Sequence, residues 1–347
     1  MSAPTEAKVA TPAREKRGDL NVGRKASTQE DSMLRLVAHL YYVRELNLKE
    51  ISEITSLSPA TISRMNRLAR ERKVVTISVA ADDSDFDDIS ARLSEQLDTP
   101  FAITPGHRVD SIKRSRISGA AAAPTVLERL PYDGIVGLSA GHTINGMLAS
   151  LGKDPRPRLG LLPLMGGWNA AYPHLDANTL VRGMAERFQA TSYPLHAPAL
   201  CDTVESRRTI LLNDTVRATT ERWDHLDAAV YGIGAPGMLQ TSTYAWTGSD
   251  DAKIAKEFNE LGVVGNILGH LYDIDGKIVQ HEWTERLITV SLEQLERVKT
   301  SIALLCGETK VKALVGLART GMSSLIITDD LTALSTLEFL ADEAAGA

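Results

Sequence analysis

The sequence predicts a protein of the α/β class in which a small helical unit precedes a larger α/β domain. Beyond about residue 85, short β-branched runs alternate with stretches of helical periodicity, which is the pattern of a largely parallel sheet covered by helices. Before residue 80, apolar residues recur at the three- and four-residue spacing of helices. We therefore divide the chain into a tail (1–28), a helical unit (29–80) and a large domain (85–345).

The composition of the 347 residues is that of a globular protein, with 43% hydrophobic and 24% charged residues. No apolar run approaches the ~20 residues of a membrane-spanning helix, and the polar N-terminus has no signal-peptide core. Cys201 and Cys306 form no CxxC pair, so no disulfide scaffold is expected and a reducing cytoplasm is indicated. The eight histidines form no His-x-x-x-His pair, so we expect no metal site and no cofactor.

The net charge of −6 conceals an asymmetry along the chain. Residues 1–80 carry 14 Lys and Arg against 9 Asp and Glu, whereas the remainder carries 24 against 35. A basic unit joined to an acidic body is expected when only one part meets phosphates, although basic segments are often simply solvated. Residues 1–28 contain almost no large apolar side chains, so we expect a disordered tail.

The helical unit has the features of a winged helix-turn-helix domain. Ser52 and Ser56 supply the small residues of a tight helix crossing, and Ser58-Pro59 is a strong helix start, with a hydroxyl cap and a proline at the first position. The β-branched run at 73–79 predicts a strand behind the helices. The residues expected on the inner face are Ile51, Ile54, Leu57, Ile62 and Met65.

The outer face of the second short helix has the order of a recognition helix, with short residues first and guanidinium groups after them. Arg70, Arg72 and Lys73 would add phosphate contacts. A generic helical hairpin with a solvated basic face, or a protein-binding module, are the alternatives, although this face lacks large apolar anchors. The residues expected to contact DNA are Lys49, Ser58, Ala60, Thr61, Ser63, Arg64 and Arg67.

Two turns of the large domain have the composition of binding sites. After the strand that starts near residue 134, Ser139, Ala140, Gly141, His142 and Thr143 lead into a helix whose amides and hydroxyls suit a phosphate or carboxylate. The spacing is neither a Walker loop nor GxGxxG, and a tight turn without a ligand is equally compatible. Strands are predicted at 101–104, 134–138, 159–163, 228–233, 302–305 and 324–328.

The second turn follows the strand at 302–305. Lys310 falls in the first turn of a helix, where a cation opposes the helix dipole unless an anion offsets it. Between the two turns, Asp273 precedes a glycine and could accept hydrogen bonds from ligand hydroxyls, although Asp275-Gly276 is also typical of a hairpin turn.

Nine short blocks in a fixed order resemble the SorC family of bacterial transcriptional regulators, which includes the deoxyribonucleoside and central-glycolytic-gene repressors. The similarity runs from about residue 31 to 340 and includes GLSAGHT at 137–143, LPLMGG at 162–167 and YDIDG at 272–276. The other blocks lie at 62–74, 195–199, 227–234, 262–267, 307–310 and 325–329.

The resemblance implies a Rossmann-like effector domain similar to phosphosugar isomerases, and a homo-oligomer, dimer or tetramer. It also implies that the turn at 139–143, with Asp273 and Lys310, binds a sugar, a polyol or a sugar phosphate. In some relatives a lysine forms a Schiff base with the ligand. The chain departs from the family at His142, where Arg is common, at Asn266, where Asp is common, and at Cys306-Gly-Glu, which replaces Ala-Gly-Gly.

The alternative function is a phosphosugar isomerase or deaminase. Related deaminases carry an acid and a histidine after the Gly-Ile-Gly turn, whereas here the residues at 235–237 are Ala-Pro-Gly, without a group for acid–base catalysis. We therefore expect no catalytic residues. The sequence predicts a cytoplasmic repressor of a carbohydrate or polyol operon, whose partners are operator DNA and a small carbohydrate or sugar-phosphate effector.

Overall fold

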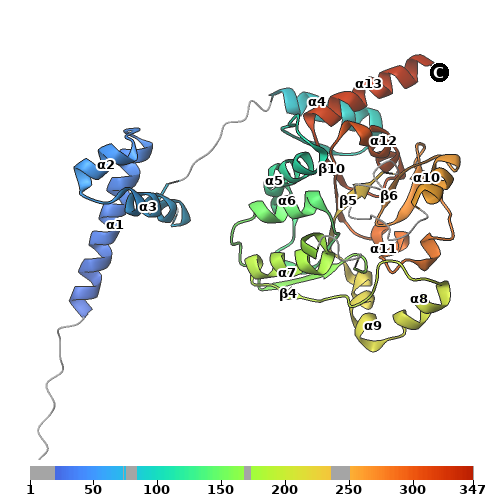
Figure 1. The fold of residues 1–347 in the computed structure, drawn as a ribbon, viewed down its shortest axis with the longest axis horizontal. Helices are drawn as coiled ribbons and strands as arrows, with labels where there is room; N and C mark the ends of the chain where they lie inside the picture. Colours follow the sequence, from blue (N-terminus) through green and yellow to red (C-terminus); the bar gives the residue numbers. More distant parts are fainter. Residues whose placement is uncertain (1–19, 73, 76–83, 168–172, 236–250, 347) are drawn as a thin grey trace, which may run out of the picture. The chain divides into compact units, whose positions relative to one another are not determined.

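The computed structural model describes residues 20–72, 74–75, 84–167, 173–235 and 251–346 (Figure 1). The chain divides into two compact units between residues 81 and 82, and each unit is described by itself. The predicted strand at 73–79 lies outside the described residues, except for Val74 and Val75.

The first unit consists of α1 (Leu20–Tyr42), α2 (Leu48–Thr55) and α3 (Pro59–Glu71). Helix α1 begins at Leu20, inside the stretch for which the sequence predicts a tail, and that prediction otherwise concerns residues outside the described ones. Residues 20–30 include Arg, Lys, Ala, Gln and Glu, which have good helix propensity.

Side-chain caps start the two short helices. The Asn47 carboxamide accepts the N–H groups of Lys49 and Glu50, and the Glu50 carboxylate accepts the Asn47 N–H, which forms a capping box.

The residues predicted on the inner face are buried or half-buried, except Ile54, which is 59% exposed. The buried apolar residues of the unit are Leu34, Val37, Ala38, Ile51, Ile62 and Ala69.

The second unit is built on one mixed sheet. Its seven parallel strands lie in the order β1-β10-β9-β5-β2-β3-β4, and three antiparallel strands extend the sheet from β5 through β6 and β7 to β8. All six predicted strands are present within a residue or two. The strands are β1 (Phe101–Thr104), β2 (Asp133–Leu138), β3 (Arg158–Pro163), β4 (Thr191–Ser192), β5 (Ala228–Gly234), β6 (Val263–Ile267), β7 (His270–Asp273), β8 (Ile278–Val279), β9 (Thr300–Leu304) and β10 (Leu325–Asp329).

Helices cover both faces of the parallel strands (Figure 1). One apolar cluster joins a strand face to α5 (Ser111–Arg129), α6 (His142–Ser150) and α7 (Ala177–Phe188). A second joins the opposite face to α4 (Ser84–Leu97), α12 (Val311–Thr320) and α13 (Asp330–Gly346). Alternate residues of one strand serve the two clusters, as in Val230 and Tyr231 of β5, because strand side chains alternate between faces.

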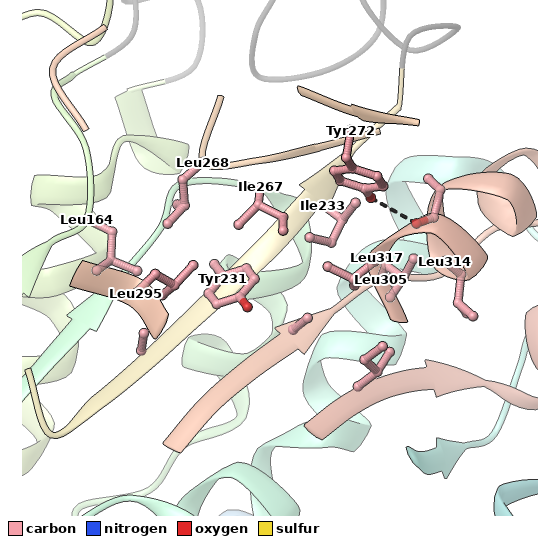
Figure 2. Packing of buried hydrophobic residues seen from close by; sticks show 14 of the residues in the cluster. Leu164, Tyr231, Ile233, Ile267, Leu268, Tyr272, Leu295, Leu305, Leu314 and Leu317 are labelled. Carbon is pink, nitrogen blue, oxygen red and sulfur yellow. Dashed lines mark hydrogen bonds between the residues drawn. The ribbon is translucent and has the colours of Figure 1, made fainter. Parts of the chain in front are cut away.

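The antiparallel extension packs into the second cluster (Figure 2). Tyr272 of β7 is fully buried, and its hydroxyl donates to the carbonyl of Ala313 in α12 at 2.8 Å. This contact fixes the extension against the helix that follows β9.

Short helices complete the unit. No helix among the described residues is long and apolar enough to cross a membrane. The remaining helices are α8 (Val204–Leu211), α9 (Asp214–Thr220), α10 (Asp251–Glu260), α11 (Leu292–Glu296), and the 3-10 turns η1 (Pro173–Leu175), η2 (Glu221–His225), η4 (Thr284–Arg286) and η5 (Glu308–Lys310).

Candidate functional site

The carboxyl ends of β2 and β5 form the switch point of the parallel sheet. From β2 the chain continues outward to β3 and β4, then returns to β5 on the other side of β2 and continues outward to β9 and β10. Helices that follow diverging strands leave a crevice at this point, and open α/β sheets bind ligands there. The predicted turn at 139–143 follows β2, and the turn with Lys310 follows β9.

Ser139 joins the two strands at the switch point. Its side chain is fully buried, its N–H donates to the Val230 carbonyl at 3.0 Å, and its Oγ accepts the Gly232 N–H at 3.0 Å. The hydroxyl donates in turn to the carbonyl of Ala140, which is also buried. Ser139 therefore ties the end of β2 to β5 at the switch point.

The start of α6 is suited to an anion. Gly141 has φ of +127°, a conformation that glycine adopts without strain, and its N–H donates to the Leu175 carbonyl. No side chain caps the helix. The first N–H groups of a helix have no partner within it and carry the positive end of the helix dipole, which favours an anionic ligand group.

Lys310 brings a buried amine to the same edge. The residue is 7% exposed, and its Nζ donates to the carbonyl of Ile233, at the end of β5, at 3.0 Å. Burial lowers the pKa of the Lys310 amine, and the nearby Cys306 opposes this shift. No carboxylate forms an ion pair with this amine in the part of the chain that the structure describes.

Several positive groups surround His142. Burial lowers the pKa of its imidazole first, and the charges of His174, Arg116 and Lys310 lower it further. His174 lies in η1, beside the Leu175 carbonyl that Gly141 contacts, and Arg116 lies on α5. The charges of Arg116 and Lys310 near the start of α6 would favour a negatively charged ligand group.

The predicted residues separate into two groups. Ser139 to Thr143 and Lys310 come together at the switch point, whereas the Asp273 carboxylate belongs to the β7–β8 turn, where it accepts the N–H groups of Asp275 and Lys277. The hairpin alternative holds for this segment, because β7 and β8 pair on either side of it.

Arg116 and His174 are absent from the sequence prediction. No motif identifies them, because they come from elements distant in the sequence from either turn. The same holds for a buried ion pair in which Arg114 Nε contacts Asp329 Oδ2 at 2.6 Å. Ser115 follows Arg114 of this ion pair in the sequence: its hydroxyl is 3.8 Å from the Cys306 thiol, and burial raises the pKa of the Cys306 thiol.

The helical unit presents the predicted polar face. Ser58 caps α3, because its Oγ accepts the Thr61 N–H at 3.2 Å. Arg67 forms a 3.7 Å ion pair with Glu71 on the helix surface. Thr61 is half-buried, and the exposed residues among those predicted to contact DNA are Lys49, Ser58, Ala60, Ser63, Arg64 and Arg67.

Two of the additional arginines have partners within the unit. Arg70 donates to the Tyr42 hydroxyl, and Arg72 forms a 2.9 Å ion pair with Asp31. Both contacts join the end of α3 to α1, so these side chains contribute to the packing of the unit. Lys73 lies outside the described residues.

The chain is similar to a known protein family and to proteins of known function. Residues 84–338 match the family model described as "Putative sugar-binding domain". The chain is 27% identical over 308 residues to the sorbitol operon regulator of Klebsiella pneumoniae, covering 86% of this chain and 95% of that protein. It is 24% identical over 305 residues to the deoxyribonucleoside regulator of Bacillus subtilis, covering 85% and 94%.

Solved structures show the same fold. The full-length sorbitol operon regulator SorC from Klebsiella pneumoniae aligns with a TM-score of 0.70 and 23% identity, over 88% of this chain and 98% of that one. A DeoR family transcriptional regulator from Listeria monocytogenes aligns with a TM-score of 0.64 and 25% identity, over 73% and 100%.

The fold and the switch-point site define a ligand-binding α/β domain preceded by a helical unit. The chain belongs to the sugar-binding domain family and, within it, to the SorC family of transcriptional regulators. The resemblance stated from the sequence is confirmed. These relatives are named as regulators and not as enzymes, which agrees with the regulatory function expected from the sequence.

Proposed function

We propose that the protein represses a carbohydrate or polyol catabolic operon and releases its operator when a small effector binds at the switch point. The observation that carries this proposal is the pairing of a buried amine, Lys310, with the uncapped start of α6. A site of this kind binds a polar ligand, and the same chain carries an exposed basic helix face in its other unit.

The helical unit would act as a winged helix-turn-helix domain. In such a unit α3 enters the major groove, with Ala60 and Ser63 close to the bases and Arg64 and Arg67 on bases or phosphates. Lys49 at the start of α2 would neutralise a phosphate. Two units in a dimer, or in one dimer of a tetramer, would reach successive groove turns, which are ~34–36 Å apart.

The effector would be a phosphorylated sugar or polyol in preference to a neutral one. A buried amine that no carboxylate of the described residues pairs with gains most from an anionic ligand, and the positive end of the helix dipole at the start of α6 suits phosphate oxygens. This choice gives the domain the ligand class of the phosphosugar isomerases that it resembles. Ser139, Ala140 and Gly141 would shape the crevice, and Asp273 is left out because its carboxylate is engaged by the hairpin.

The test measures operator release. DNA from upstream of the protein's own operon is labelled, and binding is followed by fluorescence anisotropy with and without sorbitol, erythritol, sorbitol 6-phosphate and deoxyribose 5-phosphate. Specific binding that one phosphorylated compound relieves, at constant ionic strength, supports the proposal. Release by a neutral polyol alone overturns the phosphate assignment, and the absence of specific DNA binding overturns the regulatory function.

A further inference from the structure

One buried threonine ties the Gly307–Lys310 turn to the rest of the domain. Thr332 lies near the start of α13 and is fully buried. Its Oγ1 accepts the Gly307 N–H at 2.8 Å and donates to Asp329 Oδ1 at 2.6 Å. Gly307 has φ of +115°, which only glycine adopts readily, and such a flexible residue needs an outside contact to hold its peptide in one orientation.

Asp329 is itself fixed by an arginine from another element. Arg114 of α5 donates from Nε to Oδ2 at 2.6 Å and from Nη2 to Oδ1 at 2.8 Å, and Nη2 also reaches Thr332 Oγ1 at 3.2 Å. Both charged residues are buried. A buried pair that is held by several hydrogen bonds can keep its elements in one arrangement, here β10, α13 and α5.

The network ends at the two sources of positive charge in the switch-point site. The Gly307 carbonyl accepts the Lys310 N–H at 2.8 Å, so the turn held by Thr332 also carries the buried amine. At the other end, Arg116 follows Arg114 on α5 by two residues, and its charge acts on His142. The hydroxyl of Thr332 thus lies between the elements that place Lys310 and Arg116.

We propose that Thr332 is a positioning residue of the effector site: its hydroxyl holds the Gly307 peptide, and thereby Lys310, in the geometry that binds the effector. The proposal rests on the effector site of the proposed function. Thr332 touches no ligand in this scheme, and it acts through the turn.

A matched control lies one turn further along the same helix. Thr336 is also fully buried, and its Oγ1 donates to the Thr332 carbonyl at 2.7 Å, so its hydroxyl bonds only within α13. Thr332→Val and Thr336→Val therefore remove the same group from equally buried sites. Thr332→Ser keeps the hydroxyl and serves as the conservative variant.

The first measurement needs no ligand. Hydrogen exchange of the peptide that covers residues 305–312 is compared in the full-length wild type and the three variants. Thr332→Val should exchange on the order of tenfold faster in this peptide, whereas Thr336→Val and Thr332→Ser should match the wild type. Equal exchange in Thr332→Val and the wild type would overturn the proposal, as would equal acceleration in Thr336→Val.

The second measurement uses sorbitol 6-phosphate and sorbitol as probes of operator release. Thr332→Val should bind operator as the wild type does without a probe, but require ~5- to 30-fold more of the active probe for half release. A shift of less than twofold would show that the threonine only stabilises the fold. If neither probe acts on the wild type, these probes give the proposed function no support, and the exchange measurement still decides the role of Thr332.

Discussion

Replacing Lys310 with Met separates a ligand-binding lysine from a structural one. Lys310 is only 7% exposed. The variant keeps an unbranched side chain at this position and removes the amine. Burial lowers the pKa of Lys310, so the folded protein holds this proton less tightly than the unfolded chain does. This lowers the free energy of unfolding at neutral pH. The loss disappears only as the pH rises through the pKa of the lysine in the unfolded chain, ~10.4.

The expected stability follows from two opposing effects. The variant loses the hydrogen bond from Nζ to the Ile233 carbonyl, which contributes about 1 kcal/mol. It gains from the removal of a buried charge, and replacing buried charges by apolar groups is neutral or stabilises by ~1–4 kcal/mol. Lys310→Met should therefore lie between ~1 kcal/mol less stable and ~3 kcal/mol more stable than the wild type at pH 7.

The effector response should change in the opposite direction. Loss of a desolvated charge contact to an anionic ligand costs ~2–5 kcal/mol, which raises the concentration for half release of the operator by about 30- to 4,000-fold. Thermal unfolding measures the first effect, and fluorescence anisotropy with sorbitol 6-phosphate measures the second. An unaltered dose curve would remove Lys310 from the site, and a loss of several kcal/mol of stability would identify it as a structural clamp.

Three other variants test separate parts of the molecule. Arg64→Ala should weaken operator binding by ~1–3 kcal/mol with an unchanged Tm, and unchanged anisotropy would exclude Arg64 as a contact. Arg114→Leu should cost ~3–5 kcal/mol in urea denaturation, because it leaves the buried Asp329 carboxylate without its partner; a cost under ~1 kcal/mol would contradict this. Because the pKa of His142 is lowered by burial and then by His174, Arg116 and Lys310, wild-type stability should fall relative to His142→Gln as the pH drops below ~6.5. Parallel stability curves from pH 8 to 5 would refute that account.

Local patterns predicted most of the parallel sheet. The β-branched runs that became β1, β2, β3, β5, β9 and β10 are buried, so their composition reflects their environment. The shorter strands β4 and β8 have two residues each, too few for a pattern, and β6 and β7 contain glycine or polar residues that indicate a loop. Their pairing depends on tertiary contacts such as the bond from Tyr272 to Ala313.

The same distinction holds at the site. Ser139 and Lys310 could be brought together from the sequence because both follow strands of one parallel sheet, whose carboxyl ends share an edge. Arg116 and His174 could not, since they reach His142 from α5 and η1, and their positions depend on helix packing. The assignment of Asp273 stays a prediction: its motif also encodes a hairpin, and the backbone N–H groups of that hairpin donate to its carboxylate.

In the proposed function, an effector at the switch point would change structure elsewhere in the domain. A molecule that contacts both the start of α6 and Lys310 links the β2 side of the crevice to the turn that Thr332 holds. The helix that carries Thr332 packs its Ala333, Leu337 and Leu340 into the same apolar cluster as Ile89, Leu93 and Leu97 of α4. Because α4 is the first helix after the division of the chain, we expect a ligand that shifts the turn to act on the element that precedes this domain's sheet. Coupling of this kind is reciprocal, so operator DNA should weaken effector binding by the same factor by which the effector weakens DNA binding, typically ~5- to 150-fold.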